Sequence, residues 1–204
     1  MTHELTLQRL VAIKGRVSAE LLAGSLDVDP PSVQTALDDF VERELIKPTP
    51  MGYRITPAGR AHCTELVAAE HDGVDHAAVA AIYSAFCEHN QELKAVITDW
   101  QTSGPDQPND HSDPAYDNQV LERLSTLHGG VLSLLDQIAS TAPRLDHYRA
   151  RLIRAADAVA AGDHSYVSRP IIDSYHTVWF ELHEDLIGLA GLTRAGEAEA
   201  GRGA

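Results

Sequence analysis

The sequence has few cysteines and no long apolar run. Its 204 residues include two cysteines, and neither has a partner at the spacing of a zinc or redox motif. We therefore expect neither a disulfide framework nor a cysteine-based metal site. No apolar run approaches the roughly 20 residues that a membrane helix needs, and the N-terminus lacks a signal-peptide pattern. We expect a cytoplasmic protein with no membrane partner.

The sequence also lacks the short motifs of common enzymes. A Gly-rich phosphate loop, the Gly-x-Ser-x-Gly nucleophile pattern and the His-Glu-x-x-His zinc pattern are all missing. No nucleophile and base stand at a convincing spacing. We therefore expect a protein that is not an enzyme and has no catalytic residues.

Basic residues are scarce and unevenly distributed. The chain has 16 Lys and Arg against 30 Asp and Glu, a formal net charge of −14. Residues 1–70 carry 7 basic and 10 acidic side chains, so the remaining residues carry 9 and 20. Only the first part could approach a polyanion without strong repulsion. The asymmetry predicts two parts with different roles.

The first 70 residues carry the pattern of short helices and one hairpin. Apolar residues recur at helical spacing in three segments, 5–13, 19–26 and 30–44. Three residues stand at N-cap positions before the second, third and fourth helices: Ser18, Asp29 and Thr56. A turn over 47–52 and a short alternating strand over 53–55 predict the hairpin. The predicted order is helix, helix, turn, helix, hairpin, helix.

This order resembles that of the MarR- and PadR-like winged helix-turn-helix transcriptional regulators. The segments LLAGSLDVDPPSVQTALDDFVERELI and YRITPAGRAH carry the resemblance, which covers about residues 5–70. It implies that the third helix enters the major groove of double-stranded DNA and that the hairpin wing contacts the backbone or minor groove. The DNA-facing residues that it implies are Ser32, Gln34, Thr35, Lys47, Arg54 and Arg60.

The expected recognition helix departs from that family in its charge. None of its DNA-facing positions is basic, and Asp38 and Asp39 would approach phosphates. Because affinity for DNA depends on neutralised phosphates, we expect weak binding with a shallow salt dependence unless the protein dimerises. The alternative is a winged helix that binds no DNA and docks on a partner protein or enzyme.

Beyond residue 70, long amphipathic patterns predict a four-helix-type bundle. The expected helices cover 75–100, about 115–140, 143 to about 161, and 163 or 168 to about 191. A polar loop at 102–114 joins the first two helices, and no strand pattern follows residue 60. The predicted fold class is mainly α. Its expected parts are a winged-helix domain at 1–70, a bundle at 71–192 and a disordered tail at 193–204.

Four of the 11 histidines occupy apolar stripes of the expected bundle: His89, His128, His176 and His183. Imidazoles that converge from several helices can hold a divalent metal, and Glu92 and Asp173 lie one turn away from two of them. A small-molecule effector pocket around Tyr83, His176 and Trp179 is a second possibility. Packing and dimer contacts alone are the third, and by default we expect no cofactor. A metal-binding bundle protein is accordingly the third functional hypothesis.

These observations predict a homodimeric DNA-binding regulator. Winged-helix regulators bind palindromic half-sites as two-fold dimers, so the bundle is expected to dimerise. An effector or protein partner bound to the bundle would change the spacing of the two recognition helices. Three arginines after residue 145 are expected to form surface ion pairs: Arg149, Arg151 and Arg154.

Overall fold

The computed structural model describes residues 2–104 and 107–201 of the chain, and helices make up 74% of it. The described residues form ten α-helices, one 3₁₀ helix and two short hairpins. The mainly α fold class is therefore confirmed. No helix within these residues combines the length and the apolar character that crossing a bilayer requires.

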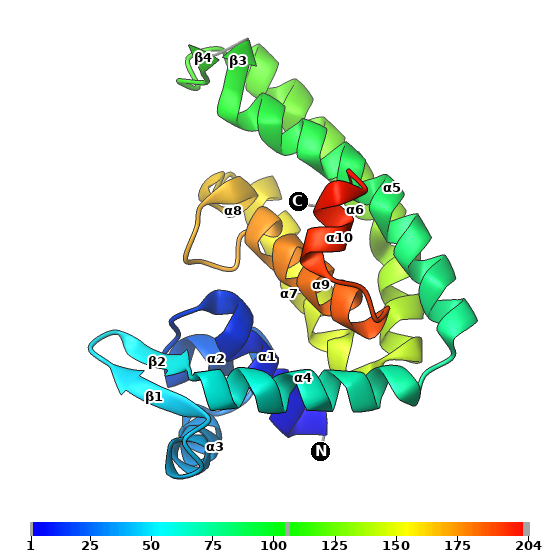
Figure 1. The fold of residues 1–204 in the computed structure, drawn as a ribbon. Coiled ribbons are helices and arrows are strands. Elements are labelled where there is room, and N and C mark those ends of the chain that lie inside the picture. The colour runs from blue at the N-terminus through cyan, green and yellow to red at the C-terminus, as the bar shows by residue number, and fades with distance from the viewer. Residues whose placement is uncertain (1, 105–106, 202–204) are drawn as a thin grey trace.

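The N-terminal unit packs four helices and a hairpin around a core of their own (Figure 1). Its elements are α1 (Thr2–Lys14), α2 (Ala19–Leu26), α3 (Pro30–Glu42), β1 (Ile46–Thr49), β2 (Gly52–Ile55) and α4 (Pro57–Asp72). The three predicted N-caps are confirmed, because the side chains of Ser18, Asp29 and Thr56 each accept a backbone N–H from the first helical turn. Leu7, Leu22 and Leu37 are among the fully buried core residues.

The hairpin alternates between a buried and an exposed face. Ile46 pairs with Ile55 and both are buried, whereas Lys47 pairs with Arg54 and both are exposed. The backbone of Val17 pairs with Tyr53 on the outer side of β2, so a third segment extends the hairpin. The alternation is confined to this end of the hairpin, since Pro48, on the same face as Ile46, is exposed.

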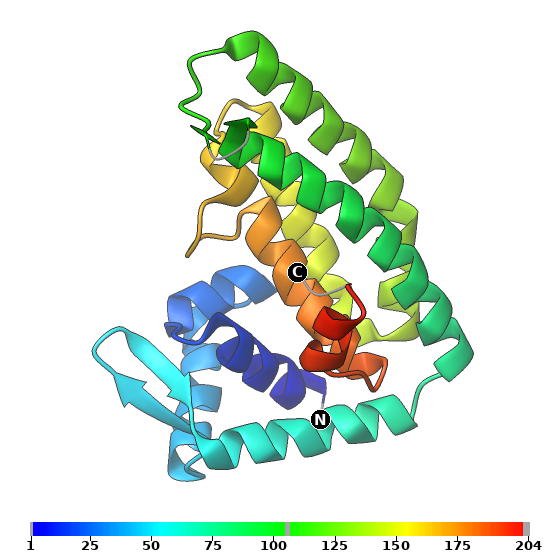
Figure 2. The same ribbon diagram turned by 45° about the horizontal axis from the view of Figure 1, so that its top comes forward.

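The C-terminal unit is built on a long antiparallel pair of helices. Its elements are α5 (His76–Gln101), β3 (Thr102–Gly104), β4 (Gln107–Pro108), α6 (Pro114–Thr141), η1 (Pro143–Leu145), α7 (Asp146–Ala160), α8 (Ser165–Ser168), α9 (Tyr175–Leu189) and α10 (Arg194–Glu199). Figure 2 shows α5 and α6 along one side of the molecule, with α9 on their inner side. A second core, from Val79 to Leu189, fills the space between them. α1 contacts both α4 and α9, so the two units pack against one another.

The last predicted helix is broken in the structure. Residues 169–174 separate α8 from α9. Arg169 is extended, with φ −61° and ψ 127°, as expected of a residue that precedes proline. Ile171 has φ +78° and is 84% exposed, and Ser174 then caps α9. The sequence places Pro170 either in the first helical turn or at a kink, and in the structure it lies between α8 and α9.

Two further segments differ from the sequence prediction. Thr102 pairs with Pro108 in a small hairpin, although no strand was expected beyond residue 60. Residues 105–106 of the expected polar loop lie outside the described residues. The segment predicted as a disordered tail contains α10, whose Glu197 is buried and bonded to Tyr83. Residues 202–204 of that tail lie outside the described residues.

Candidate functional site

The neutral residues predicted to meet DNA lie on the first half of α3. Ser32 and Thr35 are exposed, and their hydroxyls donate to the carbonyls of Asp29 and Pro31 at 2.9 and 3.0 Å. Gln34 is half-buried, and its amide donates to Asp38 at 2.7 Å and to the Tyr53 hydroxyl at 2.7 Å. The two exposed hydroxyls can accept from a ligand as they stand, whereas each of the three side chains must give up a hydrogen bond in order to donate to one.

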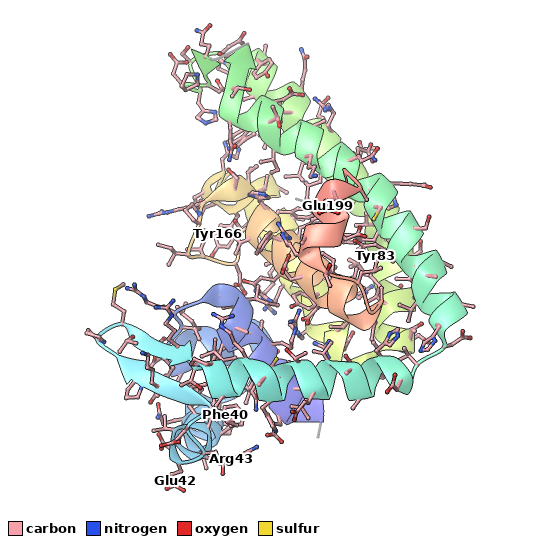
Figure 3. The ribbon with its side chains drawn as sticks, in the orientation of Figure 1. Phe40, Glu42, Arg43, Tyr83, Tyr166 and Glu199 are labelled. Carbon is pink, nitrogen blue, oxygen red and sulfur yellow. The ribbon has the colours of Figure 1, made fainter. Side chains whose placement is uncertain are left out.

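The second half of α3 is acidic. Asp38, Asp39 and Glu42 are all exposed. Arg43, which follows the helix, pairs with Asp39 at 3.0 Å and with Glu4 of α1 at 2.7 Å. Figure 3 shows Glu42 on the outer side of this end of the helix. The charge of α3 is thus divided along its length, with a neutral first half and an acidic second half.

Four exposed basic side chains lie on and around the hairpin. Lys47 and Arg54 face each other across it, and Arg60 lies in the first turn of α4. Sequence reasoning missed Arg16, which precedes Val17; the antiparallel Val17–Tyr53 pairing sets it beside Arg54. Within residues 2–104 and 107–201 none of the four forms an ion pair. We call these four residues the basic row. The only sequence clue to the place of Arg16 is the β-branched Val17 after it, a residue type that favours strand pairing.

The four histidines considered as metal ligands make separate contacts. His89 lies 3.8 Å from Glu92, and His128 lies 3.4 Å from the Tyr175 hydroxyl. Burial lowers the pKa of His128 and of His176, which is half-buried. In the part of the chain that the structure describes, no three His, Cys, Asp or Glu side chains lie close enough to hold a metal ion. The structure does not bring the four together.

The three residues considered for an effector pocket are also divided. The Trp179 indole stacks on Phe86 at 4.6 Å and donates to Asn90 at 3.0 Å, so its polar atom is already bonded. Tyr83 lines a cavity of about 400 Å³ between α4, α5 and the turn after α9. Neither His176 nor Trp179 lines that cavity.

A buried ion cluster that sequence reasoning missed joins the two units. Arg9 of α1 donates to Asp185 of α9 at 2.6 Å. Arg144 of η1 makes two bonds of 2.8 Å to Glu70 of α4, and its guanidinium lies 3.1 Å from Asp185. The Tyr148 hydroxyl also donates to Asp185, at 2.6 Å. These contacts connect α1 and α4 to η1, α7 and α9.

A second cluster repeats this arrangement further along α1. Arg151 of α7, expected at the surface, is fully buried and pairs with Asp173 at 2.7 Å and Glu181 at 2.6 Å. Lys14 of α1 reaches the same two carboxylates, at 3.1 and 2.7 Å. Ser25 of α2 donates to Asp173 at 3.1 Å. We call the two clusters together the junction network.

The junction network keeps Asp185 and Asp173 ionised. Burial alone would raise the pKa of Asp185, but Arg144 and Arg9 outweigh it and hold that pKa below its ordinary value. At Asp173 burial would likewise raise the pKa, but Arg151 outweighs burial, so the pKa of Asp173 is lowered. Removing one partner from such a buried set leaves an uncompensated charge, which is costly. The network therefore fixes one orientation of the N-terminal unit on the C-terminal unit.

Comparison of the chain with protein-family models, with curated proteins and with solved structures finds no match. The resemblance to winged-helix regulators therefore depends on the residues themselves.

Proposed function

We propose that this protein is a homodimeric DNA-binding transcription regulator that uses α3 and the β1–β2 hairpin as a winged helix. The observation that carries the proposal is the hydrogen bond between Gln34 and Tyr53. It holds the neutral half of α3 against the strand that bears Arg54. A surface able to read base edges and a surface able to neutralise phosphates are thereby adjacent.

The charge division along α3 supports this reading. Recognition helices contact base edges with their N-terminal residues, and here these are Ser32 and Thr35. Their hydroxyls suit any base. The basic row neutralises phosphates beside them, while the acidic half of α3 lies further from the duplex. Because the basic row supplies only four basic side chains in each copy, two copies are needed for useful affinity for DNA.

The junction network supports a role for the C-terminal unit in regulation. Because α1 and α2 are bonded to α9 and to the loop between α8 and α9, a movement of the C-terminal unit carries the N-terminal unit with it. In a two-fold dimer, such a movement changes the distance between the two recognition helices. Half-sites one helical turn apart tolerate little change in that distance.

The test is selection of sheared genomic DNA by the purified full chain, followed by sequencing. The proposal expects enrichment of fragments with two-fold symmetric half-sites. The double variant Arg16→Ala/Arg54→Ala is expected to lose the enrichment, and Arg123→Ala, which removes an exposed arginine from α6, is expected to keep it. No enrichment by the wild-type chain at 50 mM salt or below would contradict the proposal.

A second candidate function is a protein adaptor, which the exposed acids of α3 favour. Asp38, Asp39 and Glu42 offer a negative surface to a basic partner protein. An adaptor keeps its partner when Lys47 and Arg54 become alanine and loses it when Asp38 and Asp39 become asparagine. A DNA reader shows the opposite pattern.

A further inference from the structure

A buried polar chain runs from α9 through α5 to α10. The Tyr83 hydroxyl donates to Glu197 at 2.6 Å and lies 3.2 Å from Nε2 of His183. All three residues are buried, with 7%, 2% and 0% of their surfaces exposed, respectively. Figure 3 shows Tyr83 on α5 beside α10. Helical bundles rarely bury such groups unless the polar atoms are bonded.

The direction of the protons along this chain follows from its chemistry. A carboxylate only accepts, so the single hydroxyl proton of Tyr83 points to Glu197. Burial, helped by Arg194 and Lys94, lowers the pKa of His183 to about 4, so its ring is neutral with one N–H. That N–H is on Nε2, because the Tyr83 oxygen can only accept from it. Nδ1 is then a lone pair, and it has no hydrogen-bond partner among the described residues.

The chain of donors therefore ends in a hydroxyl that requires an acceptor. With His183 donating to its oxygen and the Cys87 thiol also in hydrogen-bond contact with it, Tyr83 offers its one proton to an anion or a carbonyl. Burial and the bond to Glu197 also raise the pKa of Tyr83 far above the ordinary phenol value, so the proton stays on the hydroxyl. The position filled by Glu197 therefore takes an acceptor oxygen, and a carboxylate binds there more strongly than a neutral carbonyl because its hydrogen bond is charge-assisted.

Glu197 and Arg194 tie α10 to the rest of the C-terminal unit. Glu197 is the only buried residue of this six-residue helix. Arg194 is half-buried, stacks over Phe180 at 4.9 Å and pairs with Glu184. The other four residues, two alanines, a glycine and Glu199, are exposed. A helix this short has no stability of its own, so α10 depends on these contacts and a competitor for the Tyr83 hydroxyl would release it.

Beside Glu197, Tyr83 also borders the cavity of about 400 Å³, whose walls include Val79, Ala80 and Leu192. We propose that Tyr83 and His183 form a binding site for an external carboxylate with a small apolar body, and that Glu197 occupies the carboxylate position when no ligand is bound. The apolar body lies in the cavity and the carboxylate bonds to Tyr83. This inference rests on the proposed function for its regulatory role, because it names the class of ligand that would act on the C-terminal unit. Its test uses no DNA, so it can fail or succeed independently of DNA binding.

The experiment compares propionate with its neutral isostere propionamide as probes of Glu197→Ala. The melting temperature of the full chain is measured at constant ionic strength. At ten times its Kd, propionate is expected to raise Tm by about 3–5 °C, and propionamide by less than about 1 °C. Glu199→Ala, which removes an exposed carboxylate from the same helix, is expected to respond to neither probe more than the wild type does.

Two outcomes overturn the inference. The first is an equal response of Glu197→Ala to propionate and propionamide. The second is an unchanged response to propionate in Glu197→Ala/Tyr83→Phe, which lacks the donor. If Glu197→Ala does not fold, hydrogen exchange of the α10 amides in the wild-type chain decides. Propionate is expected to accelerate it at least threefold relative to propionamide, and equal rates contradict the inference.

Discussion

Arg9 and Asp185, which are 176 positions apart, are joined by a hydrogen bond of 2.6 Å between Nε and a carboxylate oxygen. Asp185 is 1% exposed, and it also receives the Tyr148 hydroxyl and faces Arg144. An N-terminal residue thus completes the charge balance of a buried carboxylate in the last long helix. The two units are coupled through this residue.

Replacing Asp185 by asparagine is expected to destabilise the protein by about 3–5 kcal/mol, because Arg9 loses its counter-charge and Arg144 keeps only Glu70. Urea unfolding of the full chain measures this free energy. The control Asp136→Asn removes the partner of Arg149 at the surface and is expected to cost less than about 1 kcal/mol. Equal effects of the two variants would show that the junction network contributes no more than a surface ion pair.

Much of this fold can be predicted from sequence, because N-caps and apolar spacing are local features. Ser18, Asp29 and Thr56 cap the expected helices. The junction network could not be predicted, since a charged residue is normally placed at the surface. In hindsight a clue existed at Arg151, which follows Tyr148 and precedes Ala155 on the buried stripe of α7.

Buried histidines are expected to make stability depend on pH. Burial, with Arg151, lowers the pKa of His147 to about 3, and that of His183 is lowered to about 4. In the unfolded chain both titrate near 6.5. Their contribution to stability is complete above about pH 7 and is lost as the pH falls from about 6.5 towards these folded values.

At pH 5.5 these two histidines should therefore take up about two protons when the chain unfolds. The slope of the unfolding free energy against pH measures this uptake. His183→Gln is expected to lower that uptake by about one proton. His89→Gln changes a half-buried imidazole beside Glu92 and serves as the control. An unchanged slope in His183→Gln would show that this ring is not held neutral.

Two glycines are expected to respond in opposite ways to alanine. Gly52 has φ +110°, and a Cβ there would lie 2.3 Å from the carbonyl oxygen of Val17. Gly52→Ala should therefore break the Val17–Tyr53 pairing, destabilise the chain by at least about 1 kcal/mol and weaken DNA binding. Gly129 lies inside α6 with nothing within 4 Å of an added Cβ, so Gly129→Ala should stabilise by about 0.5–1 kcal/mol. Thermal unfolding of the pair provides the comparison.

Neutralising the acids of α3 is expected to tighten DNA binding. At about 10 Å in water each pair of unit charges interacts by about 0.4 kcal/mol, so Asp38→Asn/Asp39→Asn should raise affinity at least about threefold at low salt. Glu88→Gln/Glu92→Gln makes the same charge change on the exposed face of α5 and should have a smaller effect. Binding of a selected fragment by fluorescence anisotropy measures both. An unchanged or lower affinity for DNA in the α3 variant would show that these acids do not face the duplex.

The most direct test of DNA recognition by α3 and the hairpin is the salt dependence of binding to a two-fold symmetric fragment from the genomic selection. If each copy neutralises four phosphates, the slope of log K against log salt is about −7 for the dimer. Arg54→Ala should make it shallower by about 1.8, since two contacts are lost, and Arg123→Ala should leave it unchanged. A slope near zero, or one that Arg54→Ala does not alter, would contradict the account.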